Sequence, residues 1–430
     1  MGRAIDGEGV AKAMLAEHSL ELISLKKIQS LWAGYGHICQ VTVRASSDAV
    51  AARIRKTYGG DISVLDADGN ETFPLILKLI SPPVASELED EGHLRKIFSY
   101  EVEQNFYRSI IPKLGGDLPV ARCIAAVRGS SGSGSDKSGG LTAILMTDLR
   151  LKYPVAGEKR AVLNEKQVHS ALRWLSDFHR RSWRVLPIPL EELLQPPIQE
   201  AERRSRCSNA TTSTTSGKSS VWLNGGYTYL ATRRTEYTSL AADATSEWST
   251  ALCTPLSSSG CPIAEMVARV LTPRGRECET LIHGDVKSEN LFITKSGSEV
   301  AFYDFQYVGL GLGVCDLAKL FTCSVPVHML TEDDSSNELS MDVRERQLLE
   351  LYRENLLVGT DKVYDWNTFV RHWEAALVDW LRFQASWGFW GNTEWLEARV
   401  RSILKDEKWI NWLEEEQNHI DKNDRWPLPN

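Results

Sequence analysis

The sequence lacks paired cysteines, long apolar runs and any excess of basic charge. Its eight cysteines are scattered and none forms a CxxC pair, so the spacings of a zinc site and of a redox motif are both absent. We therefore expect reduced thiols. No apolar run is long enough for a transmembrane helix, and the first twenty residues lack the basic flank and apolar core of a secretory signal. These absences predict a cytoplasmic protein without a membrane partner.

Positive charge is scarce relative to negative charge. The 49 Lys and Arg residues are outnumbered by 57 Asp and Glu residues, which gives a formal net charge of -8. Proteins that bind nucleic acid usually carry a basic excess, so the charge balance disfavours that class of partner. An acidic balance suits a cationic small substrate, but carboxylates on a solvated surface produce the same total.

Length and composition indicate a folded chain with more than one domain. The 430 residues are 42% hydrophobic and 25% charged, which is ordinary for a globular protein, and the chain exceeds the length of a typical domain. Polar stretches of low complexity at 129–140, 205–220 and 254–260 predict surface loops.

The periodicity of apolar residues changes along the chain. β-like runs at 38–45 and 73–80 precede the first polar stretch and are followed by one helical segment, whereas helical periodicity dominates afterwards. We therefore expect an α+β fold with two lobes. The N-terminal lobe, residues 1–147, would hold a small sheet and one helix, and the C-terminal lobe, residues 148–430, would be larger and mostly helical.

The most informative segment is HGDVKSENLFI at residues 283–293. Phosphoryl transfer needs a carboxylate near the attacking hydroxyl and oxygen ligands for Mg²⁺. Asp285 is placed to accept or orient the hydroxyl proton, and Asn290 offers an amide oxygen to one metal ion. Asp304, which follows the short apolar run in VAFYDFQYV, offers a carboxylate to the other. These residues in this order predict a phosphate-transferring site.

HGDVKSEN resembles the HGDxxxxN catalytic loop of the aminoglycoside phosphotransferase and choline kinase-like superfamily, which includes CHK kinase-like and ecdysteroid kinase-like proteins. The DF of YDFQ is similar to the metal carboxylate of that superfamily, where a non-glycine residue often follows. The resemblance covers about residues 30–400. It implies a protein-kinase-like fold, ATP and Mg²⁺ as cofactors, Asp285 as the base, and Asn290 and Asp304 as metal ligands.

The resemblance also implies a lysine that binds the nucleotide phosphates from a strand of the N-terminal lobe. Lys78 stands alone in the apolar run LILKLI, where an unpaired ammonium group would be costly to bury. Its partner is expected on the following helix. Glu103 is the better candidate and Glu101 the alternate, and the two point to different helix faces.

Two further segments resemble nucleotide-binding elements. In LWAGYGHICQVTV, Gly34 and Gly36 would let the backbone approach phosphate, although Cys39 stands where a GxGxxG loop has its third glycine and a simple β-turn also fits. ILMTDLR resembles the hinge that receives adenine through backbone groups. The hinge-like residues are Met146, Thr147 and Asp148.

Two residues near the loop have supporting roles by the same resemblance. Asp316, in GVCDLAKLF, is similar to an aspartate that hydrogen-bonds the catalytic loop. The structural alternative is a helix N-cap before DLAKLF, and the two roles are compatible. His283 is expected to fix the conformation of the loop.

HGDVKSEN is also similar to the protein-kinase loop HRDLKPEN. In that loop the lysine at the position of Lys287 neutralises the transferred phosphate, so Lys287 does not by itself distinguish a protein kinase from a small-molecule kinase. Gly284 stands in place of arginine, DFQ in place of DFG, and the short stretch before GVCDLAKLF leaves no room for an activation segment. A small-molecule hydroxyl is therefore favoured over a protein as the phosphate acceptor. A pseudokinase or nucleotide-binding scaffold is the alternative, and the oligomeric state is open.

The sequence does not specify the phosphate acceptor. An amino alcohol, an aminoglycoside, a sugar and a sterol are all compatible with the motifs. Trp373, Trp380 and Trp387 recur every seven residues, a spacing typical of a helical core stripe that could also form an aromatic wall for an alkylammonium group. Asp379 and Glu394 could add negative charge for such a cation.

Overall fold

The computed structural model describes residues 6–31, 34–60, 63–82, 91–128, 141–208, 221–333 and 335–423. The chain forms two compact units, Met1–Pro154 and Val155–Asn430. The boundary that we expected after residue 147 coincides with the end of a strand. The units divide after Pro154, so a short 3-10 helix, Leu149–Leu151, belongs to the first unit.

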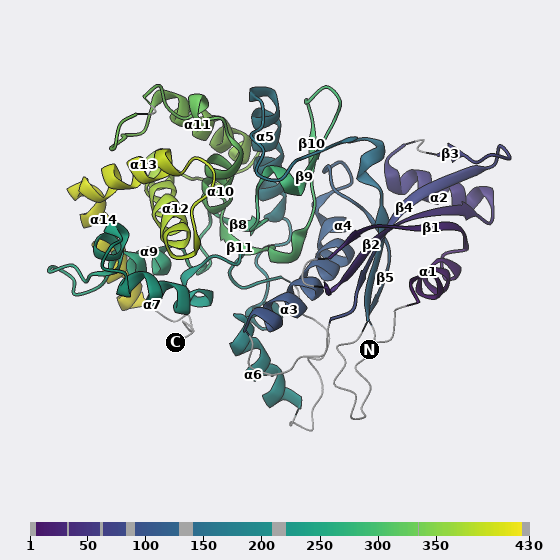
Figure 1. The fold of residues 1–430 in the computed structure, drawn as a ribbon, viewed down its shortest axis with the longest axis horizontal. Helices are drawn as coiled ribbons and strands as arrows, with labels where there is room; N and C mark the ends of the chain where they lie inside the picture. Colours follow the sequence, from purple (N-terminus) through teal and green to yellow (C-terminus); the bar gives the residue numbers. More distant parts are fainter. Residues whose placement is uncertain are drawn as a thin grey trace. The chain divides into compact units, whose positions relative to one another are not determined.

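The first unit is built on an antiparallel sheet in the order β1-β2-β4-β6-β5, with the short β3 paired to β4 (Figure 1). Its strands are β1 (Leu20–Ser30), β2 (Gly36–Ala45), β3 (Val64–Leu65), β4 (Glu71–Ile80), β5 (Cys123–Arg128) and β6 (Thr142–Thr147). The β-like runs predicted at 38–45 and 73–80 are β2 and β4, which pair with Val41 opposite Leu75.

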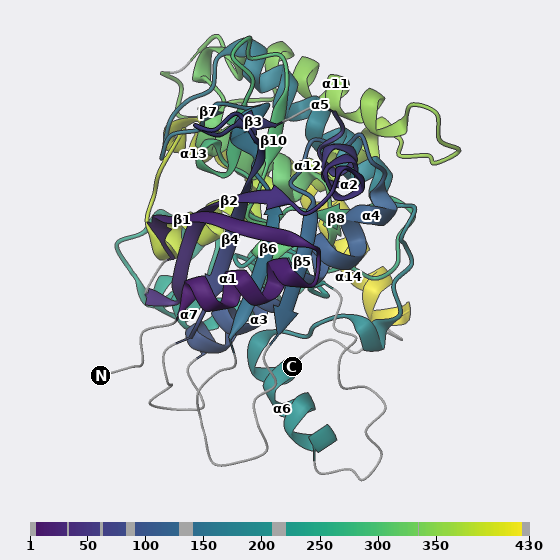
Figure 2. The ribbon, with the colours of Figure 1, turned by 90° about the vertical axis from the view of Figure 1, so that its right-hand side faces the viewer.

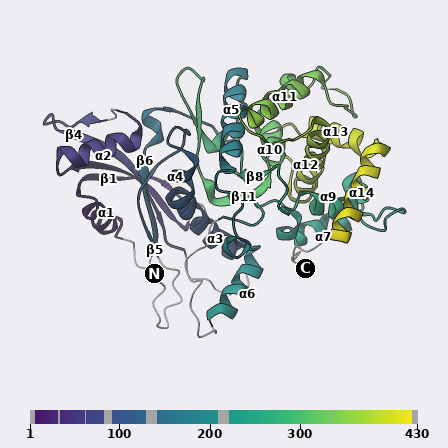
Figure 3. The same ribbon diagram turned by 180° about the vertical axis from the view of Figure 1, so that it is seen from behind.

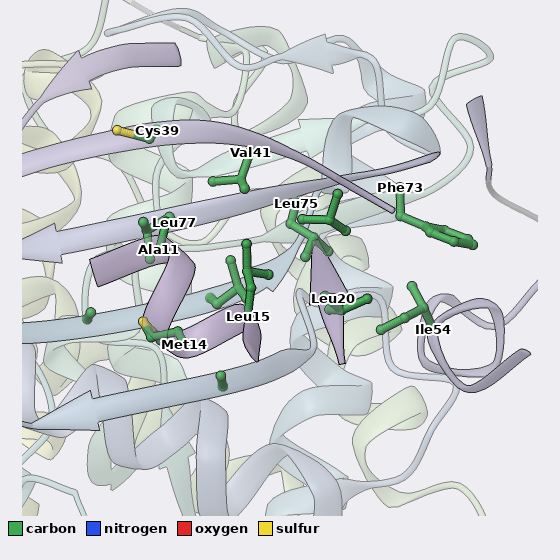
Figure 4. Packing of buried hydrophobic residues seen from close by; sticks show 14 of the residues in the cluster. Ala11, Met14, Leu15, Leu20, Cys39, Val41, Ile54, Phe73, Leu75 and Leu77 are labelled. Carbon is green, nitrogen blue, oxygen red and sulfur yellow. The ribbon is translucent and has the colours of Figure 1, made fainter. Parts of the chain in front are cut away.

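Helices α1 (Gly7–Ala16) and α2 (Asp48–Tyr58) cover one face of this sheet, and Figure 2 shows α1 lying across the strands. Successive side chains of a strand point to opposite faces, so alternate residues of β2 and β4 form the apolar core under these helices. In Figure 4, Leu15 of α1 and Ile54 of α2 point toward this core, which includes Val41 and Leu75.

The opposite face is packed against α3 (Glu91–Asn105), which continues through a π-helical turn (Phe106–Ile110) into α4 (Ile111–Leu114). Tyr100 of α3 packs with Ile80 of β4 in a second apolar cluster.

We expected one helix in this part of the chain, and that expectation is wrong because α1 and α2 are also present. Each has about three turns, too few for a clear 3.6-residue repeat. Their starts are marked by side-chain caps: Asp6 accepts from the Gly9 N–H at 2.9 Å and Ser47 from the Val50 N–H at 3.4 Å.

The second unit is mostly helical. Its α-helices are α5 (Glu165–Ser182), α6 (Pro197–Ser208), α7 (Arg234–Ala242), α8 (Glu247–Cys253), α9 (Ile263–Leu271), α10 (Val314–Ser324), α11 (Val343–Leu357), α12 (Trp366–Trp387), α13 (Thr393–Lys405) and α14 (Glu407–Asn423). Helix α12 is central and packs against α9, α10 and α13 (Figure 3). Within the described residues, no helix has the length and apolarity needed to cross a membrane.

Short strands in the second unit hold the segments that carry the predicted chemistry. They are β7 (Val155–Ala156), β8 (Glu279–Ile282), β9 (Leu291–Ile293), β10 (Val300–Phe302) and β11 (Gly309–Leu312). They form a three-stranded sheet, β10-β9-β7, and a two-stranded sheet, β11-β8. Of the predicted loops, 254–260 forms exposed turns, whereas 129–140 and most of 205–220 lie outside the described residues.

Candidate active site

The HGDVKSEN segment connects β8 to β9. It leaves β8 at His283 and ends in a 3-10 turn, Ser288–Asn290, immediately before β9. The Ser288 N–H donates to Ser324 Oγ of α10 at 2.8 Å, and the Ser288 hydroxyl donates to the Glu158 carbonyl at 2.9 Å. The loop is therefore tied to its surroundings at its C-terminal end.

Asp316 fixes the N-terminal end of the loop. Its carboxylate is fully buried and accepts from the His283 N–H at 2.7 Å and from the Gly284 N–H at 2.9 Å. The side chain lies within the first turn of α10, whose N-cap position is Gly313, so Asp316 is not the N-cap. Lys319, one turn later, donates to the Gly284 carbonyl at 2.5 Å. One helix thus holds both polar groups of the Gly284 backbone.

The His283 ring links the loop to the segment that follows β10. Its Nε2–H donates to the Tyr303 carbonyl at 2.9 Å, and its Nδ1 accepts from the Asp285 N–H at 3.2 Å. These partners require a neutral ring with the proton on Nε2. Burial lowers the pKa of His283 despite the nearby carboxylates, in agreement with a neutral role in fixing the loop.

Gly284 occupies a place that no other residue can fill without rearrangement. Its φ is +84°, and a Cβ atom would lie 2.5 Å from the Tyr307 carbonyl oxygen and 2.6 Å from the Gly226 nitrogen. Both neighbours are backbone atoms, which cannot rotate away as a side chain would. An arginine, as in HRDLKPEN, is therefore excluded from this loop conformation.

We expect Gly284→Ala to lower the free energy of unfolding by about 2–3 kcal/mol, because it combines a left-handed backbone with overpacking. Urea denaturation of the variant measures this loss. Gly297→Ala is the matched control, since its φ is also positive, at +72°, but its Cβ would meet no atom closer than 3.5 Å. Equal losses for both variants would show that the crowding around Gly284 has no energetic consequence.

Asp285, Lys287 and Asn290 are brought together by the loop. Asn290 Nδ2 donates to the Asp285 carbonyl at 2.8 Å and to Asp285 Oδ2 at 2.9 Å. Lys287 Nζ lies 3.2 Å from Asp285 Oδ2 and 3.1 Å from Glu289 Oε1. Burial alone would lower the pKa of Lys287, but the two carboxylates outweigh it and raise this pKa. The lysine is therefore charged.

Asp304 lies at the same end of the β9–β10 hairpin as Asn290. Leu291 pairs with Phe302, Asn290 precedes β9, and the Tyr303 N–H donates to the Asn290 carbonyl at 3.0 Å. Asp304 adopts a left-handed conformation with φ +66°, which is uncommon for a residue other than glycine, and its Oδ1 accepts from Gln306 Nε2 at 2.5 Å. The hairpin thus places an amide and a carboxylate close to each other.

In the first unit, Lys78 pairs with Glu103. Nζ of Lys78 on β4 lies 2.5 Å from Oε2 of Glu103 on α3, and both side chains are buried. Lys78 also lies over the Tyr100 ring, 5.3 Å from its centroid. Glu101 instead pairs with Arg128 at 2.5 Å. The choice between the two glutamates is thereby settled in favour of Glu103.

Gly34 and Gly36 lie between the last residue of β1 and the body of β2, and the Leu31 N–H donates to the Gly36 carbonyl at 2.8 Å. Gly34 has φ +75° and open space around its Cβ position, whereas a Cβ on Gly36 would lie 1.9 Å from the Leu79 carbonyl oxygen. Gly36 is therefore needed for the close approach of β2 to β4, and Gly34 for the backbone angle alone.

The hinge-like residues end β6 within the sheet. Met146 lies opposite Ile76 of β4 and Cys123 of β5. The Thr147 N–H donates to the Arg122 carbonyl at 3.0 Å, and the Asp148 N–H to the Tyr58 hydroxyl at 3.2 Å. These two N–H groups are therefore already bonded within the first unit.

The tryptophan stripe of α12 does not form one surface. Trp373 is fully buried and its Nε1–H donates to Glu345 at 2.7 Å, Trp380 is 4% exposed, and Trp387 is 58% exposed. A seven-residue spacing drifts by about 20° per repeat around a straight helix, so the stripe turns from core to surface. Asp379 pairs with the buried Arg382 at 2.9 Å, and its charge is thereby balanced within the unit.

Two site residues were missed in the sequence. His179 of α5 is fully buried, with Nε2 lying 3.1 Å from Asp316 Oδ2 and Nδ1 lying 2.7 Å from the Tyr352 hydroxyl. Arg233 is 6% exposed and lies over aromatic rings near α12. The only sequence signal for His179 is a polar residue on the apolar face of LSDFHRRSW. Arg233 gave none.

A β-rich unit with a buried Lys–Glu pair, followed by a mostly helical unit with an HGDxxxxN loop, defines a kinase-like protein. The chain belongs to the ecdysteroid kinase-like family, since the model of that family matches residues 53–336, well over half of the chain. This match confirms the superfamily predicted from HGDVKSEN and YDFQ. The predicted α+β class, with a sheet-rich first unit and a larger, mostly helical second unit, is likewise confirmed.

Solved structures of small-molecule kinases are similar over nearly the whole chain. A Ralstonia eutropha protein named as an aminoglycoside phosphotransferase is 11% identical, with a TM-score of 0.40, covering 95% of this chain and 98% of its own. Choline kinase from Cryptosporidium parvum is 11% identical, with a TM-score of 0.39, and the match covers 96% of this chain and 95% of that one. An amicoumacin kinase in complex with AMP-PNP and Ca²⁺ is 12% identical, with a TM-score of 0.38, and the match covers 99% of this chain and 96% of that one. Because these identities and TM-scores are low, family membership rests on the sequence match. No protein with a curated description matches the chain.

Proposed function

We propose that this protein transfers the γ-phosphate of ATP to a hydroxyl group of a small molecule. The observation that carries the proposal is the anchored loop, in which Asp285, Lys287 and Asn290 lie within hydrogen-bonding or ion-pair distance of one another. Such a loop holds a carboxylate rigidly without burying it fully, as a positioned base requires.

Each residue has a distinct role in this proposal. Asp285 accepts or orients the proton of the acceptor hydroxyl, and Lys287 neutralises charge on the transferred group. In the first unit, Lys78, held by Glu103, binds nucleotide phosphates. Gly34 and Gly36 shape the turn that would cover the phosphates, Gly34 by its positive φ and Gly36 by its close approach to β4, and Met146, Thr147 and Asp148 contribute backbone groups to adenine.

The residues at the hairpin end fit a magnesium ion. Mg²⁺ usually takes one or two carboxylates, with water and substrate phosphates completing its octahedron. Asn290 uses its amide nitrogen to bond Asp285, which leaves its oxygen as a ligand beside the Asp304 carboxylate. No cluster of three or more His, Cys, Asp or Glu side chains suited to a metal occurs in the described parts of the chain, so a site built wholly from such protein ligands is not found there. Bound Mg²⁺ would neutralise negative charge on the phosphates.

The direct test is phosphate transfer itself. Protein and MgATP would be incubated with amino alcohols, aminoglycosides, sugars and sterols, and products searched by mass spectrometry for a phosphate-sized gain. A gain with wild type that is absent with Asp285→Asn supports the proposal. MgATP binding without any transfer across the library would instead favour a pseudokinase or nucleotide-binding scaffold.

Asp304→Ala is expected to abolish Mg²⁺-dependent ATP binding, because it removes the carboxylate ligand proposed for the metal. Calorimetric titration with ATP, with and without Mg²⁺, measures the effect. Glu299→Ala, exposed at the other end of the same hairpin, is the control and should bind as wild type. A normal Mg²⁺ dependence in the Asp304 variant would remove Asp304 from the metal site.

A further inference from the structure

The first unit holds a cavity that none of the roles assigned above uses. Its volume is about 560 Å³, which lies within the range of small-molecule sites. It borders β5, the strand at one edge of the sheet (Figure 2), and is also lined by the last turn of α2, the π-helical turn after α3 and the start of α4. None of the residues proposed above to bind nucleotide or metal, all of them described in the structure, lines this β5 cavity.

Positive charge dominates the lining of the β5 cavity. Lys56 of α2, Arg108 of the π-helical turn and Arg122, which immediately precedes β5, all line it, whereas no described Asp or Glu residue does. This lining contrasts with the whole chain, in which 57 acidic residues outnumber 49 basic ones. Because like charges repel one another, three cations without a carboxylate beside them favour the binding of an anion.

The Lys56 and Arg108 side chains are exposed and available to a ligand. Neither forms a hydrogen bond or an ion pair with a described residue. Arg122 is held differently, because its Nη2 donates to the carbonyls of Gly116 and Leu118 at 2.7 and 2.8 Å. The β5 cavity thus combines one anchored guanidinium with two cations that an anion could engage.

Much of the remaining lining is apolar. Tyr107 and Ile111 each have 1% of their surface exposed, and Ile124 and Ala126 of β5 are half-buried. All four residues line the β5 cavity. A ligand that covered them would gain from the removal of apolar surface from water, in addition to any attraction between charges.

The π-helical turn brings an aromatic ring and a cation to the same cavity. Tyr107 and Arg108 are consecutive residues of this turn, and both line the β5 cavity. Burial raises the pKa of Cys123 on β5 to about 11, and the positive charge of Arg108 partly opposes this rise. The guanidinium therefore lies close enough to β5 to act on groups there. Single π-helical turns are rare and occur frequently at functional sites.

We propose that the β5 cavity binds a small organic anion, in which a carboxylate or phosphate group is attached to an apolar body. Lys56 and Arg108 contact the anionic group, since hydrogen bonds between charged groups are stronger than those between neutral ones. The apolar body covers Tyr107, Ile111 and Ile124, which an inorganic phosphate ion is too small to do. The site lies wholly within the first unit and does not depend on phosphate transfer.

Ligands that share one apolar body but differ in charge test the proposal. The anions 1-naphthyl phosphate and 1-naphthaleneacetate and the uncharged 1-naphthalenemethanol would be titrated by calorimetry into the full-length protein without nucleotide. Inorganic phosphate serves as the anion without an apolar body. At least one naphthyl anion is expected to bind with a Kd at least about tenfold lower than that of the alcohol or of inorganic phosphate. The tighter of the two naphthyl anions identifies the preferred anionic group.

Variants assign this binding to the β5 cavity. Lys56→Gln/Arg108→Gln should weaken binding of the preferred anion at least about tenfold. Lys26→Gln/Lys113→Gln is the matched control, because it removes two exposed cations that do not line the cavity, and it should change the Kd by less than about twofold. Ala126→Phe fills the apolar part without changing any charge and should also weaken binding. Melting temperatures show whether each variant is folded.

Three results would overturn the proposal. The first is that neither naphthyl anion shows saturable binding, and the second is that the alcohol or inorganic phosphate binds as tightly as the anions do. The third is that the two double variants bind the preferred anion equally well. Phosphate transfer is measured separately with the acceptor library, so failure of the anion site leaves the proposed function untouched.

Discussion

Asp285→Asn is expected to lower turnover by about 10² to 10⁴ while nucleotide binding stays nearly unchanged. The amide has the size of the carboxylate, and its oxygen can still accept from Asn290 Nδ2, which donates to Asp285 Oδ2 at 2.9 Å. It cannot accept a proton at neutral pH, however, and Lys287 loses the partner that lies 3.2 Å away. The loop should therefore survive while its base is lost.

Glu289→Gln is the matched control for this variant. Glu289 lies 3.1 Å from the same Lys287 ammonium, so the substitution removes one negative charge from the same lysine without touching the proposed base. Turnover should fall by no more than a few-fold. Steady-state kinetics with an acceptor found in the library, together with MgATP titration, separates the two effects. Unchanged turnover in Asp285→Asn would show that Asp285 is not the base.

The parts of the site that could be predicted from the sequence are those that depend on residues close together along the chain. HGDVKSEN and YDFQ carry their residues at fixed spacings, and short β-like runs mark β2 and β4, so Asp285, Asn290 and Lys78 could be singled out in advance. A lone lysine in an apolar strand also predicts a buried partner. Choosing Glu103 over Glu101 required the phase of α3 against the sheet, which a sequence without strong amphipathic contrast does not specify.

The parts that were not predictable depend on contacts between distant segments. Arg233 lies 150 positions before Phe383, and only the packing of α7 against α12 brings the two together. His179 and Asp316 likewise come from separate helices. Tertiary packing also decides that Trp373 is core while Trp387 is surface, because a seven-residue spacing fixes a helix face only approximately. Aromatic residues at regular spacing therefore predicted a stripe without predicting what covers it.

Asp316→Asn is expected to be strongly destabilising, by about 3–5 kcal/mol, because a buried charge network loses its central member. The carboxylate is fully buried and accepts from His283, Gly284 and His179. An amide has one oxygen, so its nitrogen would face at least one of these donors. Urea denaturation at pH 7 measures the loss. Asp361→Asn, an exposed substitution, should change the free energy of unfolding by less than about 0.5 kcal/mol.

The pH dependence of the stability lost in Asp316→Asn shows whether the loss comes from the missing negative charge or from altered packing. Burial alone would raise the pKa of Asp316, but the hydrogen bond and electrostatic interaction with His179, together with the charge of Lys319, outweigh it and hold this pKa below its usual value. A carboxyl whose folded pKa is depressed stabilises the protein above the unfolded pKa of about 3.9, and the contribution is lost as pH falls toward the folded pKa. The stability gap between wild type and Asp316→Asn should therefore be constant from pH 7 to about 5 and narrow below about pH 4.

If the difference in unfolding free energy between wild type and Asp316→Asn stays constant below pH 4, the variant is destabilised by altered packing and hydrogen bonding rather than by loss of the charge. His179→Gln provides a second measure, since it removes the imidazole from Asp316 but leaves the two backbone donors of the loop in place. If Asp316 positions the loop through those donors, this variant should lose stability yet keep a larger fraction of wild-type turnover than Asp316→Asn. Equal loss of turnover in both would show that the imidazole, and not the carboxylate alone, holds Asp285 in its working position.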